Sequence, residues 1–286
     1  MRIDELIAES VAVIDTALSG ESTARLDAEL LLSHVLKKQR SYLYAYPEVL
    51  LKPEHLAEFY PLLQQRCDGQ PMAYLLGEKE FWSLSLSVDK RVLIPRPETE
   101  EMVEQVLDLP LPLQSVVADL GTGSGAIALA LAKEKPHWFV VASDFSAQAV
   151  EVAKQNAQQC QENNNQAAEQ FLLLRADWLS AFAENSFDLI VSNPPYIDAL
   201  DAHLKQGDVQ FEPLSALVSP NTGLADIEKI VAGADTCLKA GGYLAIEHGY
   251  DQGERIVALL DRHGYQDIVD HHDLAGIPRF VIARKK

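Results

Sequence analysis

The chain has 286 residues, of which 48% are hydrophobic, so it is long enough to form two domains with proper cores. Its formal net charge of −18 disfavours a nucleic-acid substrate, because binding to a phosphate backbone depends on Lys and Arg displacing counterions, whereas a basic protein would be attracted. No apolar run is long enough to span a bilayer and the N-terminus lacks the pattern of a signal peptide, so we expect a cytoplasmic protein without a membrane partner.

The sequence of residues 1–80 predicts a small helical domain. Apolar residues recur with a helical period over residues 3–18 and 23–36, and a third helix begins after Pro53. No acid–base or metal-binding constellation occurs in this part of the sequence. We therefore expect residues 1–80 to recognise a substrate while another part of the chain carries the chemistry.

Residues 81–110 are expected to connect this domain to the rest of the chain. Apolar and polar residues alternate from 81 to 88, which predicts a strand, and a turn at Asp89-Lys90 would lead to a second strand over residues 92–94. Prolines and acidic residues then precede a helix that ends near Leu109. The segment therefore predicts a β-hairpin followed by a linker helix.

From residue 111 to 286 we expect a second domain of the α/β class. Strands alternate with helices, which is typical of a doubly wound parallel sheet. The expected helices cover residues 126–133, 147–158, 226–238 and 252–262, with a polar surface loop over residues 161–170. The expected strands cover residues 116–120, 138–143, 171–174, 187–192, 243–247, 265–269 and 280–283.

A polar turn, Asn193-Pro194-Pro195-Tyr196, follows the strand expected over residues 187–192. Two prolines prevent a continuing ladder, so the backbone turns out at the C-terminal end of the strand, where open α/β sheets bind ligands. An asparagine amide, a proline carbonyl and a tyrosine ring can together hold a planar NH2 group. An ordinary Pro-Pro turn is the alternative, but the flanking Asn193 and Tyr196 favour a catalytic turn.

A glycine loop, Asp119-Leu120-Gly121-Thr122-Gly123-Ser124-Gly125, lies between an expected strand and an expected helix. Glycines let a ligand approach the backbone, and the start of the helix offers free N–H groups. The loop lacks the Lys-Ser/Thr pair of a P-loop and does not fit G-x-G-x-x-G. The loop therefore indicates a nucleoside cofactor that is bound neither by a P-loop nor by a G-x-G-x-x-G dinucleotide loop.

Two further strand ends complete this cofactor site. Asp144 can accept both hydroxyls of a ribose, although capping of the next helix is an alternative role. Asp177 and Trp178 suit the edge and the face of an adenine. The residues that we expect to hold the cofactor are Asp119, Gly121, Thr122, Gly123, Ser124, Gly125, Asp144, Asp177, Trp178 and Asn193.

These residues, in this order, resemble a class I S-adenosylmethionine-dependent methyltransferase that acts on planar NH2 nitrogens. The wider pattern is similar to the peptide chain release factor glutamine methyltransferases, the HemK/PrmC family. The segment Ser219-Pro220-Asn221-Thr222-Gly223 departs from the usual family pattern, which is richer in glycine. The other motifs that carry the resemblance are Arg66…Gly69-x-Pro71…Tyr74-Leu75-x-Gly77, Ile94-Pro95-Arg96-Pro97-Glu98-Thr99-Glu100, Phe211-Glu212-Pro213, Ala216-Leu217, Glu247-x-Gly249 and Asp273-Leu274-Ala275-Gly276…Arg279.

The resemblance implies a seven-stranded, mostly parallel sheet, S-adenosylmethionine as cofactor, and methylation of N5 of the glutamine in the Gly-Gly-Gln motif of class I release factors. It implies catalytic roles for Asn193, Pro194, Pro195 and Tyr196. We hypothesise that the Asn193 oxygen and the Pro194 carbonyl accept the two N–H bonds of the substrate while Tyr196 packs on the amide plane. We expect a monomer without direct nucleic-acid binding, and no metal ion, because the three cysteines form no metal-binding pattern.

Two other classes of function stay open. An N6-adenine DNA or N2-guanine rRNA methyltransferase would use the same tetrapeptide on an exocyclic amine, but the acidic charge and the lack of a basic recognition segment argue against it. A cofactor-binding module without catalysis would have no need of an intact turn at Asn193-Pro194-Pro195-Tyr196, which we call the acceptor turn.

Overall fold

A computed structural model describes residues 1–18, 23–162 and 171–286, so most of the loop expected over residues 161–170 lies outside the described residues. The chain divides into two compact units. One consists of Met1–Glu78 and Lys205–Phe211, and the other of Lys79–Leu204 and Glu212–Lys286. Within the described ranges no helix combines the length and the apolar character needed to cross a membrane.

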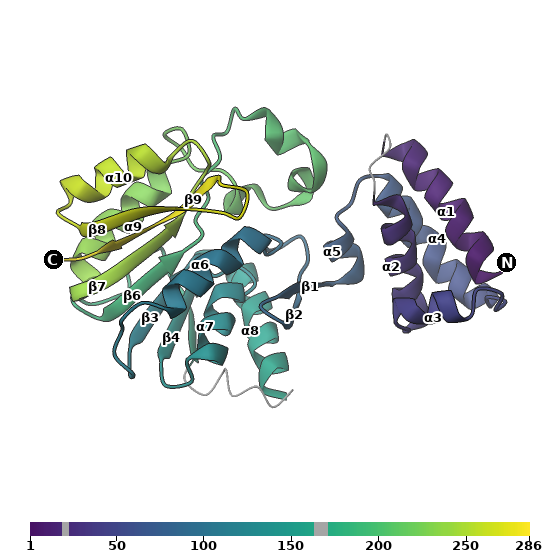
Figure 1. The fold of residues 1–286 in the computed structure, drawn as a ribbon, viewed down its shortest axis with the longest axis horizontal. Coiled ribbons are helices and arrows are strands. Elements are labelled where there is room, and N and C mark those ends of the chain that lie inside the picture. The colour runs from purple at the N-terminus through teal and green to yellow at the C-terminus, as the bar shows by residue number, and fades with distance from the viewer. Residues whose placement is uncertain (19–22, 163–170) are drawn as a thin grey trace. The chain divides into compact units, whose positions relative to one another are not determined.

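The first unit is helical (Figure 1). Its core is formed by fully buried side chains that include Leu6, Ile14, Leu31 and Phe59. The segment Lys205–Phe211 belongs to this unit, although in sequence it lies between two strands of the sheet in the other unit, and no sequence pattern predicted this. The helices are α1 (Ile3–Ala17), α2 (Ala24–Leu36), α3 (Arg40–Ala45), α4 (Pro53–Cys67) and α5 (Met72–Leu76).

The second unit is built on a seven-stranded sheet with the strand order β5-β4-β3-β6-β7-β9-β8. The strands from β5 to β7 are parallel, and β9 runs antiparallel to both β7 and β8. The predicted doubly wound, mostly parallel sheet is therefore confirmed. The strands are β3 (Val116–Leu120), β4 (Phe139–Asp144), β5 (Phe171–Arg175), β6 (Phe187–Ser192), β7 (Leu238–Glu247), β8 (Gln266–His272) and β9 (Pro278–Arg284).

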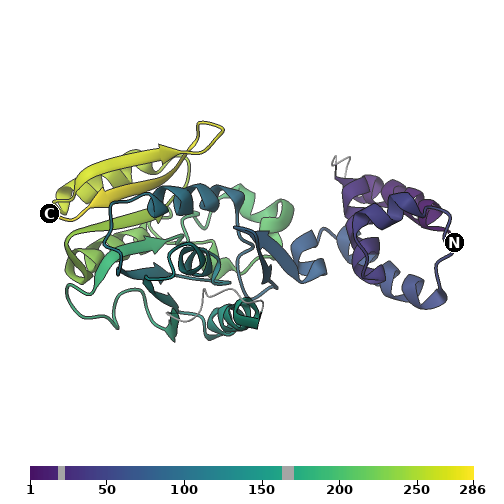
Figure 2. The ribbon, with the colours of Figure 1, turned by 60° about the horizontal axis from the view of Figure 1, so that its bottom comes forward.

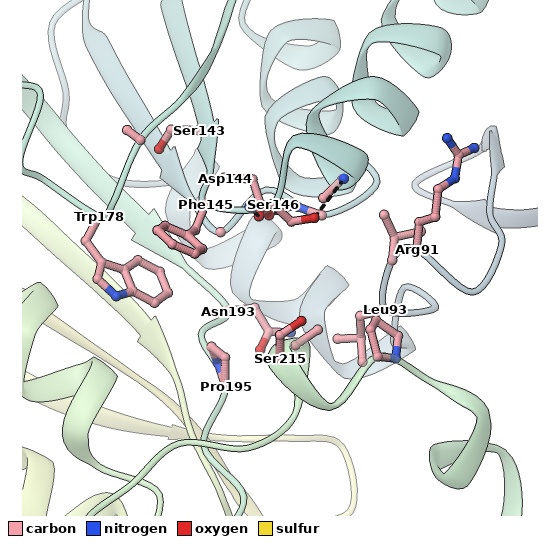
Figure 3. Close-up of a pocket in the computed structure, with 17 residues that line it drawn as sticks. Arg91, Leu93, Ser143, Asp144, Phe145, Ser146, Trp178, Asn193, Pro195 and Ser215 are labelled. Carbon is pink, nitrogen blue, oxygen red and sulfur yellow. Dashed lines mark hydrogen bonds between the residues drawn. The ribbon is translucent and has the colours of Figure 1, made fainter.

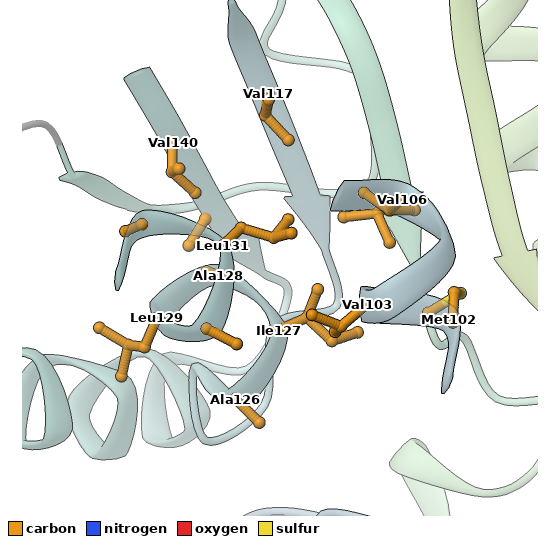
Figure 4. Close-up of a cluster of buried hydrophobic side chains, with 14 of the residues drawn as sticks. Met102, Val103, Val106, Val117, Ala126, Ile127, Ala128, Leu129, Leu131 and Val140 are labelled. Atoms are coloured by element: carbon orange, nitrogen blue, oxygen red, sulfur yellow. The ribbon is translucent and has the colours of Figure 1, made fainter. Parts of the chain in front are cut away.

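Helices cover both faces of this sheet, because successive strand residues point to opposite sides. Val117 packs in one cluster with α6 and α7 (Figure 4), whereas Ala118 packs in another with α9 and α10. Figures 1 and 2 show the two helical layers with the sheet between them. The helices are α6 (Pro97–Leu107), α7 (Ala126–Glu134), α8 (Ala147–Glu162), α9 (Ala225–Cys237) and α10 (Gly253–Arg262).

The strand order reverses between β3 and β6, two neighbouring strands in the middle part of the sheet. From β3 the chain proceeds to β4 and β5 on one side, and from β6 to β7 on the other. Crossover connections leave the sheet in opposite directions at such a point, so a crevice opens beyond the carboxyl ends of the two strands. The fold therefore predicts a ligand site where β3 and β6 end.

The hairpin lies earlier in the sequence than predicted. Its strands are β1 (Glu78–Phe81) and β2 (Leu84–Ser87), and the turn is Trp82-Ser83, where φ is 51° and 55°. β2 lies within the strand predicted over residues 81–88, whereas the turn predicted at Asp89-Lys90 and the second strand predicted over residues 92–94 were wrong. A two-residue turn with positive φ normally contains Asn, Asp or Gly, so this turn carries no sequence signal.

Candidate active site

A cavity with about 770 Å³ of empty space, part of it open to solvent, lies at the carboxyl edge of the sheet (Figure 3). Four strand ends and two other loops form its walls. The lining residues are Gly121 and Gly123 after β3, Ser143 to Ser146 at the end of β4 and beyond it, Ala149 in α8, Ala176 and Trp178 after β5, Asn193 and Pro195 after β6, Arg91 to Leu93, and Pro213, Ser215 and Ala216.

Asp119 supports the glycine loop from beneath and lines no described cavity. Its Oδ2 accepts hydrogen bonds from Thr122 Oγ1 at 2.6 Å and from the Ala128 amide at 3.1 Å. Burial raises the pKa of Asp119 to about 7, although these two hydrogen bonds oppose the shift. Its Oδ1 is buried without a hydrogen-bond partner among the described residues. Asp119 therefore leaves one acceptor for a bound cationic group or a water molecule.

Asp144 joins the glycine loop to the turn that precedes α8. Its Oδ2 accepts a hydrogen bond from the Gly123 amide at 3.0 Å, and its Oδ1 accepts one from the Ser146 amide at 2.8 Å. Burial raises the pKa of Asp144, against the effect of these hydrogen bonds. Each carboxylate oxygen has a second lone pair, so Asp144 can still accept hydrogen bonds from a ligand in the cavity.

Two aromatic side chains line the same cavity. Trp178 is held by a hydrogen bond from its Nε1 to Asp226 Oδ1 at 3.2 Å. Phe145, which is 66% exposed, was not predicted as a site residue, although an aromatic residue directly after Asp144 was a usable signal. Asp177 is exposed and lines neither this cavity nor its neighbour. Of the predicted pair, only Trp178 is therefore placed to contact a cavity ligand.

The turn after β6 is held by contacts on both sides. Asn193 and Pro195 line the cavity, whereas Pro194 and Tyr196 do not. The Tyr196 hydroxyl donates to Glu247 Oε1 at 3.3 Å, and burial raises the pKa of Tyr196. The Tyr196 carbonyl accepts a hydrogen bond from Gln252 Nε2 at 2.9 Å. The turn is therefore fixed by its backbone and by its tyrosine hydroxyl.

The segment Ser219-Pro220-Asn221-Thr222-Gly223, which departs from the usual family pattern, lies against this turn. Gly223 has a φ of +83°, and a Cβ atom there would lie within 2.8 Å of the Tyr196 carbonyl carbon. Only glycine can therefore occupy this position without displacing the turn.

A smaller cavity with about 390 Å³ of empty space adjoins the first and shares Asn193 with it. Thr122, Ser124, Arg96 and Thr99 line it. The glycine loop thus contributes to both cavities, although the predicted site residue Gly125 lines neither.

Glu212 ties together two segments that contribute to the cavity walls. Its buried carboxylate accepts hydrogen bonds from Arg96 Nη2 at 2.6 Å and from the Ile94 amide at 3.2 Å. The segment that contains Arg96 is thereby joined to the loop that begins at Glu212. Neither residue was predicted as a site residue; their only signal was membership of the motifs that carry the family resemblance.

Comparison with known proteins gives matches over nearly the whole chain. Residues 13–77 match the PrmC N-terminal domain, and residues 100–210 match the methyltransferase small domain. The release factor glutamine methyltransferase of Shewanella oneidensis is 46% identical, covering 97% of this chain and 96% of that protein. The protein of the same name from Vibrio cholerae serotype O1 is 47% identical, covering 94% of this chain and 92% of that protein.

A solved methyltransferase structure from Pyrococcus furiosus has the same fold. It is 19% identical, has a TM-score of 0.52, and covers 71% of this chain and 89% of that one. The sequence identity to the curated relatives over nearly their full length is what decides the family. The chain belongs to the release factor glutamine methyltransferase family.

Proposed function

We propose that this methyltransferase transfers the methyl group of S-adenosylmethionine to N5 of the glutamine in the Gly-Gly-Gln motif of class I peptide chain release factors. One observation carries the proposal. Asn193, which can hold a planar amide, lines the same cavity as Asp144 and Trp178, which can hold a nucleoside. A cofactor and an amide would therefore meet in one cavity. The names of the curated relatives support the same reaction.

The residues present fit S-adenosylmethionine. Asp144 would accept the ribose hydroxyls, and Trp178 and Phe145 would contact the adenine. The smaller cavity, next to the start of α7, would take the methionine end of the cofactor. The unpartnered Oδ1 of Asp119 lies beneath the glycine loop and could accept a hydrogen bond from the ammonium group of the cofactor or from a water molecule. When bound, the cofactor supplies an electrophilic methyl sulfonium.

The protein must make an amide nitrogen reactive, because the nitrogen lone pair is delocalised into the carbonyl. In our proposal the Asn193 side-chain oxygen accepts one N–H bond of the substrate, and the carbonyl of Pro194, which reaches the substrate only once it is bound, accepts the other; together they raise the electron density on nitrogen and orient it. Pro195 shapes the cavity wall and Tyr196 holds the turn in place. The proton leaves after transfer, when the nitrogen has become acidic, so no general base is assigned.

The proposal includes recognition of the release factor by the helical unit. A glutamine side chain alone buries too little surface for specificity, since stable protein partners usually bury roughly 800 Å² each. The enzyme would act as a cytoplasmic monomer on a protein, without direct binding to nucleic acid or to a membrane.

Transfer of label from S-adenosylmethionine tests this proposal. The acceptors are a release factor, the same factor with Gln→Ala in its Gly-Gly-Gln motif, and duplex DNA. We expect label on the intact factor alone, and label on DNA or on the Gln→Ala factor would overturn the proposal. Asn193→Ala should lower turnover about 10²-fold or more while cofactor affinity is kept. Equal losses in turnover and in affinity would contradict the assigned roles.

A further inference from the structure

Glu247 is a buried carboxylate that contacts the acceptor turn through the Tyr196 hydroxyl and lines neither cavity. It is the last residue of β7, the neighbour of β6, and so lies level with the start of the turn. Its Oε2 accepts a hydrogen bond from Thr99 Oγ1 at 2.6 Å, and its Oε1 accepts one from the Tyr196 hydroxyl at 3.3 Å. One carboxylate thus connects α6 to the turn.

The hydrogen bonds continue from Thr99 to Asn193, whose Nδ2 lies 3.2 Å from Thr99 Oγ1. A threonine hydroxyl has a single proton. Because an ionised Glu247 can only accept, Thr99 must give it this proton and can then only accept from Asn193. The NH2 end of the Asn193 amide is thereby kept on Thr99, and the oxygen end is left for the substrate.

We propose that Glu247 is a positioning residue that acts through Thr99 to determine which end of the Asn193 amide faces the substrate. The inference rests on the proposed transfer to an amide nitrogen. A substrate NH2 needs an acceptor. If the Asn193 amide were reversed, it would present N–H to N–H and could not hold the substrate.

Protonation of Glu247 would permit this reversal. A neutral carboxyl can donate to Thr99, and Thr99 can then donate to the Asn193 oxygen. The pKa of Glu247 is raised to about 7, because burial and, to a smaller extent, the charge of Glu98 on α6 disfavour the ionised form. The hydrogen bonds from Thr99 and Tyr196, together with the charge of Arg279 on β9, lower it. The active, ionised form of Glu247 therefore predominates above this pKa and is lost as the pH falls through it.

Kinetics of the full-length enzyme test this role at saturating cofactor and release factor. For the wild type we expect kcat to fall about tenfold per pH unit below the pKa of Glu247. Glu247→Gln should lack this decline, because a glutamine does not titrate. Asp119 has a similar pKa, but its titration would persist in Glu247→Gln. A Glu247→Gln enzyme that keeps the wild-type decline would overturn the proposal.

A matched pair of variants at Thr99 separates positioning from packing. Thr99→Val keeps the shape and removes the hydroxyl, and Thr99→Ser keeps the hydroxyl. We expect Thr99→Val to lower kcat about tenfold, the effect of losing one hydrogen bond, with a small change in the KM for release factor. Thr99→Ser should restore most of the rate. Wild-type kcat in Thr99→Val would overturn the proposal.

An NMR measurement tests the positioning role of Glu247 without relying on methyl transfer. The side-chain NH2 signal of Asn193, assigned through its loss in Asn193→Asp, should titrate with the pKa of Glu247 and should stop titrating in Glu247→Gln. If the wild type methylates no release factor, the proposed function fails while this signal still tests the positioning. A signal that is insensitive to pH and to Thr99→Val would overturn the inference, whatever the substrate.

Discussion

The close approach of Gly223 to the acceptor turn allows a quantitative test of how accurately the turn must be placed. In Gly223→Ala the new Cβ would lie 2.8 Å from the Tyr196 carbonyl carbon and 2.6 Å from Gln252 Nε2. Carbon atoms normally approach no closer than about 3.5 Å, so the turn must move by roughly 0.7 Å or more. A displacement of about 1 Å can lower a rate about 10²-fold. We therefore expect kcat to fall between about tenfold and 10²-fold.

Gly264→Ala is a matched control for this variant. Gly264 has a φ of +79°, close to that of Gly223, but no atom lies within 4 Å of the position of its Cβ. Gly264→Ala should lose about 1–2 kcal/mol of unfolding free energy through backbone strain, as measured by denaturant titration, and Gly223→Ala should lose at least as much because its Cβ also clashes with the turn. Only Gly223→Ala should lose kcat, and its affinity for S-adenosylmethionine, measured by calorimetry, should be nearly unchanged. Wild-type kcat in Gly223→Ala, or an equal loss in the control, would refute the reasoning.

Three further changes test other parts of the molecule. Asp144→Ala removes a charged double acceptor worth about 1.5–3 kcal/mol, so cofactor affinity should fall about tenfold or more in calorimetry. Unchanged affinity in a folded variant would leave Asp144 as only a link between loop and helix. The buried Asp27 accepts a hydrogen bond on its Oδ2 from Arg66 Nε at 2.8 Å, and Arg66→Met leaves it without this ionic partner. The unfolding free energy should drop by about 3–5 kcal/mol, and a drop below about 1 kcal/mol would contradict this estimate. Removal of residues 1–77 should raise the KM for an intact release factor far more than that for a Gly-Gly-Gln peptide, while a folded fragment with full activity on the intact factor would show that the helical unit has another task.

The sheet was predictable because its buried strands produce strong local patterns. The strand predicted over residues 187–192 agrees with β6, and the strand predicted over residues 116–120 agrees with β3. The short helices α3 and α5 were missed, since five or six residues cannot display a helical period. The turn at Trp82-Ser83 was missed because its residues are unusual for positive φ. Local patterns therefore specify the long elements and leave the connections open.

The site residues likewise divide into those that a local sequence pattern reveals and those that it does not. Asp144, Trp178 and Asn193 were found because each lies at or just after the end of a strand, and parallel strands end at one edge. Thr99 and Glu247 reach the acceptor turn from α6 and β7, at positions set by packing and strand order. No local sequence pattern records such a contact, so only the three-dimensional structure could identify it.

The assignment of Lys205–Phe211 to the helical unit has a consequence for exchanging parts between relatives. The Phe211 ring lies 3.4 Å from where a Cβ of Gly69 would be, so this segment is fitted to its own helical partner. The next residue, Glu212, is bound to Arg96 at the cavity wall. A chimera that replaced residues 1–78 alone would pair a foreign helical unit with a native 205–211 segment. A transplanted recognition unit must therefore include both pieces, with three junctions in the chain, to keep the contacts of each unit.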